Sequence, residues 1–108
     1  MRKLNIYVNN TKAGLLVEKA PGRGYVFTYD KDYLASSGPA ISVNLPKREA
    51  PYESTYLFPF FSNLLPEGRY RNAICRLNKI DERDLFGIMC YLAGADTIGA
   101  VEWRTVDD

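Results

Sequence analysis

The sequence has 108 residues, of which 46% are hydrophobic and 13% aromatic, as is typical of one folded globular domain, expected here over residues 1–108. Fourteen basic and thirteen acidic residues leave a formal net charge of +1, which argues against the strongly basic face that direct nucleic-acid binding requires. Histidine is absent and two cysteines make a zinc site improbable, so we expect no metal, no cofactor and no small-molecule substrate.

The composition also bears on the compartment. The basic start Met1-Arg2-Lys3 is not followed by the apolar segment of a signal peptide, and no stretch approaches the roughly 18–20 apolar residues of a membrane span. Cys75 and Cys90 stand among core-like residues, where reduced thiols behave as small hydrophobic groups. We therefore expect a cytoplasmic protein with no membrane contact.

The first thirty residues predict three antiparallel strands. Apolar and polar residues alternate over Lys3–Val8, and the same period returns in Tyr25–Tyr29. Between them, Asn9-Asn10 predicts a tight hairpin into a strand at Ala13–Glu18, because asparagine tolerates left-handed backbone. The proline and glycines of Ala20–Gly24 predict the next turn.

The following segment predicts one more strand between two loops. Residues 30–39 are rich in polar, glycine and proline residues and predict a loop with one helical turn. Ile41–Leu45 alternates apolar and polar residues, which predicts a short fourth strand closed by Pro46. Lys47–Glu53 is polar and predicts a loop leading into the first full helix.

The stretch Leu57–Gly68 carries three phenylalanines and three leucines at the spacing of one helical face, so it predicts a short buried helix. Ser54 or Thr55 is the expected N-cap and Pro59 is expected in the first turn. The residue before a proline avoids helical backbone, so the helix should end one or two residues before Pro66. Four residues are expected to hold the core together: Phe60, Phe61, Leu64 and Leu65.

Two further helices are predicted after this one. The second begins with Pro66 in its first turn, and the third begins at an N-cap at Asp81 and ends at Gly94. The second helix has an apolar stripe at Tyr70, Ala73, Ile74 and Leu77, while its outward residues are expected to be Arg69, Arg71, Asn72, Arg76 and Lys79. The third has an apolar stripe at Leu85, Met89 and Leu92, flanked by Phe86 and Ala93.

Ile98–Val106 alternates again and predicts a closing strand. The order is then four strands, three short helices and one strand. Strands that come first and helices that come later are typical of an α+β fold. We expect an antiparallel, partly barrel-like sheet of about five strands, with three short helices inserted before the last strand.

The chain offers little that points to catalysis. Gly22-Arg23-Gly24 is expected to be a turn, because no helix follows it as a phosphate-binding loop would require. The carboxylates Asp81, Glu82 and Asp84 are explained by a helix N-terminus, and no nucleophile motif or kinase catalytic loop is present. The residues alone therefore predict a non-enzymatic binding or regulatory module.

The stretch Phe60–Gly68, Phe-Phe-Ser-Asn-Leu-Leu-Pro-Glu-Gly, resembles the Phe-Phe-x-Asn-Leu-Leu-Pro-(Glu/Asp) signature of the N-terminal subdomain of HipA-type toxin kinases. Further segments resemble that subdomain in the same order: Lys3–Gly14, Phe27–Tyr29, Tyr33–Ala35, Ile41–Pro46, Asp84–Ile88 and Gly94–Val101. The ATP-binding and catalytic residues of those kinases have no counterpart in this chain.

The resemblance implies a stand-alone subdomain, similar to the HipS antitoxin of split HipBST toxin–antitoxin systems. The implied partner is a HipT-like kinase, and a helix-turn-helix HipB-like protein is a further candidate for the same complex. Two alternatives stay open: an N-terminal fragment of a full-length HipA-type toxin kinase, and direct nucleic-acid binding through the arginine-rich helix. The expected partner-binding residues are Asn63, Glu67, Gly68, Arg69, Tyr70 and Arg71.

Overall fold

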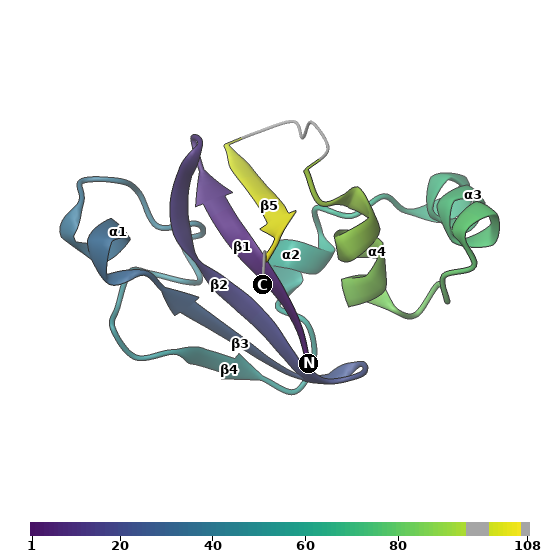
Figure 1. The fold of residues 1–108 in the computed structure, drawn as a ribbon, viewed down its shortest axis with the longest axis horizontal. Helices are drawn as coiled ribbons and strands as arrows, with labels where there is room; N and C mark the ends of the chain where they lie inside the picture. The colour runs from purple at the N-terminus through teal and green to yellow at the C-terminus, as the bar shows by residue number, and fades with distance from the viewer. Residues whose placement is uncertain (95–99, 107–108) are drawn as a thin grey trace.

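A computed structural model describes residues 1–94 and 100–106 (Figure 1). Five strands and four short helices make up the described chain. In order they are β1 (Arg2–Val8), β2 (Thr11–Ala20), β3 (Arg23–Tyr29), α1 (Lys31–Ala35), β4 (Tyr52–Ser54), α2 (Pro59–Ser62), α3 (Gly68–Asn78), α4 (Leu85–Leu92) and β5 (Val101–Thr105).

The strands form one open antiparallel sheet in the order β4-β3-β2-β1-β5, which confirms the predicted α+β class. The first hairpin turns at Asn9 and Asn10, whose φ angles of 49° and 68° are the left-handed values that a two-residue turn needs. The predicted single helical turn is α1, and the last strand returns to pair with β1. Ile98, where that strand was expected to begin, lies outside the described residues.

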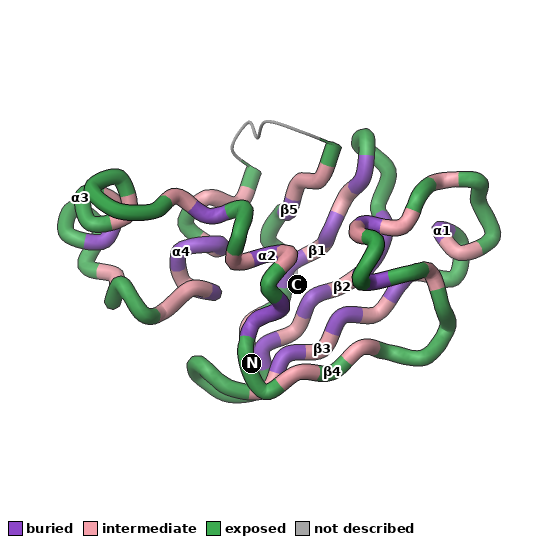
Figure 2. Tube along the Cα trace, turned by 180° about the vertical axis from the view of Figure 1, so that it is seen from behind, coloured by how far each residue is buried: buried purple, intermediate pink, exposed green. Residues whose placement is uncertain are grey.

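The core lies on one face of the sheet, against α2 and α4 (Figures 1 and 2). The ring of Phe27 on β3 lies 6.0 Å from that of Phe61 on α2, measured between centroids. On α4, the Met89 carbonyl accepts a hydrogen bond of 2.8 Å from Trp103 Nε1 on β5. Strand β3 therefore packs on α2, and the last strand, β5, packs on α4.

The strand predicted at Ile41–Leu45 is wrong. These residues form a turn with a single bridge between Ser42 and Leu45, and Val43 is 94% exposed. The buried hydroxyl of Tyr29 forms the hydrogen bonds to backbone groups of this turn that a neighbouring strand would otherwise form. It accepts a hydrogen bond from the Ile41 N–H at 3.0 Å and donates one to the Leu45 carbonyl. The alternation of apolar residues therefore reflects two buried side chains, Ile41 and Leu45, on either side of a tight turn.

The fourth strand is instead Tyr52–Ser54, which falls where a polar loop was predicted. It pairs antiparallel with β3 through Tyr52 opposite Phe27 and Ser54 opposite Tyr25. Since it is a three-residue edge strand, one half-buried residue at each end is enough to attach it, and its sequence shows no alternation of apolar residues.

The helix boundaries also differ from prediction. Pro59 is in the first turn of α2 as expected. The N-cap is Phe58 and not Ser54, which belongs to β4. The helix ends at Ser62. Hydrogen bonds of the i to i−3 type continue the turn as far as Leu65, just before Pro66. Among the four expected core residues, Phe61 and Leu65 are buried, Phe60 is partly buried and Leu64 is exposed.

The N-cap of α4 is Asp84, not Asp81. The Asp84 carboxylate accepts from the Gly87 N–H at 3.0 Å, whereas Asp81 accepts from the Arg83 N–H in the preceding turn. Glycine is required at position 87 because an added Cβ would lie 2.3 Å from the Asp84 carboxylate. Gly94 follows the helix with a φ of 81°, as its predicted C-terminal role demands.

Candidate partner-binding surface

The predicted surface is the bend between α2 and α3. It is held by backbone contacts: the Asn63 N–H donates to the Pro59 carbonyl at 2.9 Å, and Arg71 Nε donates to the Pro66 carbonyl at 2.7 Å. Gly68 opens α3 with a φ of 59°, which favours glycine. Five of the predicted residues are exposed, namely Asn63, Glu67, Gly68, Arg69 and Tyr70, and Arg71 is half-buried.

Helix α3 lies at one end of the molecule, beyond α4 and away from the sheet (Figure 1). Its single buried residue is Cys75, and most of the helix is exposed (Figure 2). Tyr70 is 71% exposed and Leu77 is 81% exposed. At about 100° per residue, these two side chains lie roughly opposite Cys75 on the helix. The apolar stripe of α3 therefore faces away from the protein.

This orientation corrects two sequence-based expectations. Residues predicted to be the outward face include Arg71, which is half-buried and bonded to the bend. The apolar stripe, by contrast, is largely exposed. The thiol of Cys75 takes the core-facing position, and burial raises its pKa, as it does that of Cys90. Both cysteines are free.

The charges of α3 all have one sign. Its sequence contains Arg69, Arg71 and Arg76 and no acidic residue. In the described part of the chain, neither Arg69 nor Arg76 forms an ion pair. The exposed end of the molecule thus presents apolar side chains beside unneutralised guanidinium groups.

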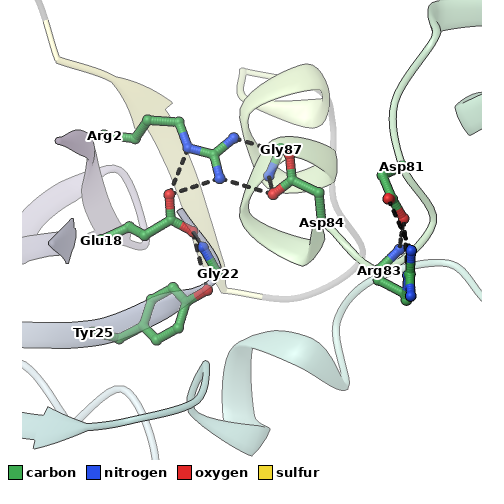
Figure 3. Close-up of polar contacts among 8 residues, drawn as sticks. All are labelled: Arg2, Glu18, Gly22, Tyr25, Asp81, Arg83, Asp84 and Gly87. Atoms are coloured by element: carbon green, nitrogen blue, oxygen red, sulfur yellow. Dashed lines mark hydrogen bonds and ion pairs between the residues drawn. The ribbon is translucent and has the colours of Figure 1, made fainter. Parts of the chain in front are cut away.

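A second polar assembly fastens α4 to the sheet (Figure 3). The Glu18 side chain on β2 is 2% exposed and accepts hydrogen bonds from Arg2 Nε at 2.7 Å and from the Tyr25 hydroxyl at 3.0 Å. The guanidinium of Arg2 also donates to both oxygens of Asp84, at 2.8 and 3.1 Å. One arginine therefore joins β1, β2 and the N-terminus of α4. We call these four residues the ionic cluster.

The cluster changes the pKa of its members. The hydrogen bond from Arg2 is the main reason why the pKa of Asp84 is lowered, against the opposing effect of burial. The same bond to Asp84 raises the pKa of Arg2. Burial, followed by the hydrogen bond to Glu18, raises the pKa of Tyr25 to about 12. Tyr25 therefore stays neutral and donates to Glu18 well into the alkaline range.

Alkaline stability tests this assignment. An unfolded tyrosine has a pKa near 10, so the contribution of Tyr25 is complete below pH 10 and is lost as the pH rises through about 12. Between pH 9 and 11.5, we expect wild type to lose about 1–2 kcal/mol more unfolding free energy than Tyr25→Phe in urea titrations. The matched control is Tyr56→Phe at an exposed tyrosine. Equal pH dependence of wild type and Tyr25→Phe would contradict the cluster.

The ionic cluster was not identified from the sequence, although one signal was present. Glu18 shares the strand face of Leu16, so alternation places a carboxylate on the core side, where it needs a cation or hydrogen-bond donors. An open pocket of about 590 Å³ borders the ionic cluster. The buried polar groups of the cluster already form hydrogen bonds with one another, so the cluster has the geometry of a structural connection.

Two other kinds of feature are absent from residues 1–94 and 100–106. No group of three or more histidine, cysteine, aspartate or glutamate side chains is placed to hold a metal ion there. None of the helices in those ranges is both long and apolar enough to cross a membrane.

Comparisons with known proteins agree on the type of domain. The sequence model described as "HipA N-terminal domain" matches residues 4–104. A protein of Haemophilus influenzae (strain ATCC 51907 / DSM 11121 / KW20 / Rd), described as an uncharacterized protein, is 32% identical over 102 residues, which are 94% of this chain and 91% of the relative. A solved "N-terminal domain of HipA toxin" matches with a TM-score of 0.75 and 29% identity, covering 100% of this chain and 95% of that one.

Proposed function

Because the chain belongs to the HipA N-terminal domain family, we propose that it is a non-enzymatic antitoxin that binds and restrains a HipA- or HipT-like serine/threonine toxin kinase. The matched domain is part of a toxin, which supports a place in a toxin–antitoxin system. A helix-turn-helix HipB-like protein is the proposed third component of the complex. The two free thiols are compatible with a reducing cytoplasm, where we place the protein.

One observation carries the proposal of a separate protein. The 102 aligned residues make up 91% of the Haemophilus influenzae relative, so that relative is also about the size of this single domain. In the proposed role the chain acts without a kinase body of its own. Its effect on a kinase must then come from binding, and the absence of histidine and of kinase motifs agrees with a non-enzymatic role.

Binding is supported by the surface at the α2–α3 bend. Asn63, Glu67 and Tyr70 are exposed on a segment whose backbone is fixed by the Arg71 and Asn63 hydrogen bonds. A surface that is ordered before binding loses little conformational entropy when a partner docks. We therefore propose the bend, with Gly68 and Arg69, as part of the kinase contact.

Co-purification tests the function. The full chain, carrying an affinity tag, is co-expressed with a HipA-type kinase, and kinase autophosphorylation is measured with and without the chain by mass spectrometry. We expect a stable complex, since an interface of standard size forms at nanomolar to micromolar concentration. At a saturating concentration of the chain, we expect autophosphorylation of the kinase to fall at least about tenfold. A tagged chain that retains no kinase, together with unchanged autophosphorylation, would refute the proposal.

The alternative is that the chain is the N-terminal structural subdomain of a full-length toxin kinase. The match to a domain solved as part of a toxin favours it. The reading frame separates the two: a kinase body encoded in frame after Asp108 supports the alternative, whereas a stop codon followed by a separate kinase gene supports the antitoxin.

A further inference from the structure

The strongest unexplained feature is the outer stripe of α3, formed by Tyr70, Ala73 and Leu77, with half-buried Ile74 at its margin. Isolated exposed apolar residues are normal, but these recur at i, i+3 and i+7 and form one continuous row along the helix. Within the described chain, α3 is attached through Cys75 on its other side. The amphipathic pattern of this helix is therefore not used for folding.

Charge narrows the choice of what covers the stripe. Arg69 and Arg76 lie one above the other along one edge of it, at i and i+7, and both are exposed. Neither has a carboxylate partner among the described residues, and α3 itself contains no acid. An apolar groove bordered by aspartate or glutamate is the surface that complements such a helix.

From this geometry we infer that α3 is a docking helix, and that its outer stripe lies in an apolar, acid-rimmed groove of the partner kinase. The inference rests on the proposed function and extends it from the bend to three turns of helix. Tyr70 and Leu77 are the anchors that become buried, while Arg69 and Arg76 meet the acidic rim. A helix that binds in a groove contacts its partner through side chains at the i, i+3 and i+7 spacing.

The apolar anchors are tested with the double variant Tyr70→Ser/Leu77→Ser. The matched control is Val43→Ser/Tyr56→Ser, which removes one aliphatic and one tyrosine side chain that are as exposed (94% and 76%) but lie outside α3. Dissociation constants for the HipA-type kinase are measured by calorimetry. We expect at least about a 30-fold weakening for the α3 variant and less than threefold for the control, because truncating central anchors dominates binding energy.

The charged edge is tested with Arg69→Glu/Arg76→Glu against the control Arg23→Glu/Lys31→Glu, whose residues are also exposed. We expect the α3 reversal to slow association about tenfold at 50 mM salt and to lose most of that effect at 0.5 M salt, since screening weakens steering between exposed charges. Circular dichroism and thermal unfolding of every variant confirm that the fold is intact, as expected for exposed positions.

The outcomes separate this inference from the proposed function. If wild type binds the kinase and the Tyr70→Ser/Leu77→Ser variant binds equally well, the docking helix is refuted and the antitoxin proposal stands. If wild type binds no kinase, both fall. If the α3 substitutions leave kinase affinity unchanged but abolish self-association of the chain in light scattering, or a nucleic-acid gel shift, then that other ligand occupies the stripe and the inference is overturned.

Discussion

Replacing Phe61 with alanine is expected to lower the free energy of unfolding by about 4 kcal/mol, which is a large part of the roughly 5–15 kcal/mol that stabilises a domain. Phe61 is fully buried, and its ring lies 5.2 Å from that of Phe60, 6.0 Å from Phe27 and 6.3 Å from Phe58. Alanine leaves a cavity between α2 and the sheet that these rigid neighbours fill poorly. Urea unfolding followed by circular dichroism measures the loss.

Comparison with Phe60→Ala separates the effect of burial from the effect of removing a phenyl ring. Phe60→Ala removes the same atoms from the preceding residue, which is only partly buried, so we expect about half the loss. Leu64→Ala, at an exposed position of the same motif, should cost less than about 1 kcal/mol. Equal losses at Phe60 and Phe61 would mean that α2 does not pack on the sheet as described.

The first three strands were predictable because their signal is local. In β1, Leu4, Ile6 and Val8 are all buried at a period of two, and the asparagine turn forces the hairpin. The helices that begin at Pro59 and Leu85 were predictable in existence from their apolar periodicity, although the capping carboxylate of the second was expected at Asp81 instead of Asp84. Such features depend on neighbours in sequence, so periodicity identifies them.

The turn at Ile41–Leu45, where a strand was predicted, was not predictable because it depends on a side chain that is distant in the sequence. Ile41 and Leu45 alternate as in a strand, yet the hydroxyl of Tyr29 satisfies their backbone groups instead. Edge strand β4 depends on pairing with β3 alone. Long-range hydrogen bonds decided both outcomes, and a single sequence carries no record of them.

The candidate surface shows a different limit. The apolar period of α3 predicted a buried stripe, but periodicity does not say whether such a stripe packs inside the chain or stays exposed. Tyr70 and Leu77 are exposed, so the residues that looked like core became the best docking candidates. The polar bend lies on the surface as expected, apart from the half-buried Arg71.

Replacing Arg2 with methionine is expected to cost about 3 kcal/mol of unfolding free energy, because it leaves the buried carboxylate of Glu18 and the capping carboxylate of Asp84 without their shared cation. Methionine keeps much of the contact that the guanidinium makes over the Phe86 ring, at 5.3 Å from its centroid. The control is Arg83→Met, which breaks the exposed pair with Asp81 and should change the free energy of unfolding far less than Arg2→Met does.

The pH dependence distinguishes an ionic role of Arg2 from simple packing. The folded pKa of Asp84 is lowered, chiefly by its hydrogen bond from Arg2, so the stabilisation is complete above the unfolded pKa near 3.9 and is lost as the pH falls through the folded pKa. Wild type should therefore lose stability between pH 5 and 2 more steeply than Arg2→Met, measured by urea titration. If the two proteins keep a constant difference across that range, Arg2 acts through packing alone. A difference that narrows in acid shows that one guanidinium holds the capped end of α4 to the sheet, and with it the chain segment that carries α3.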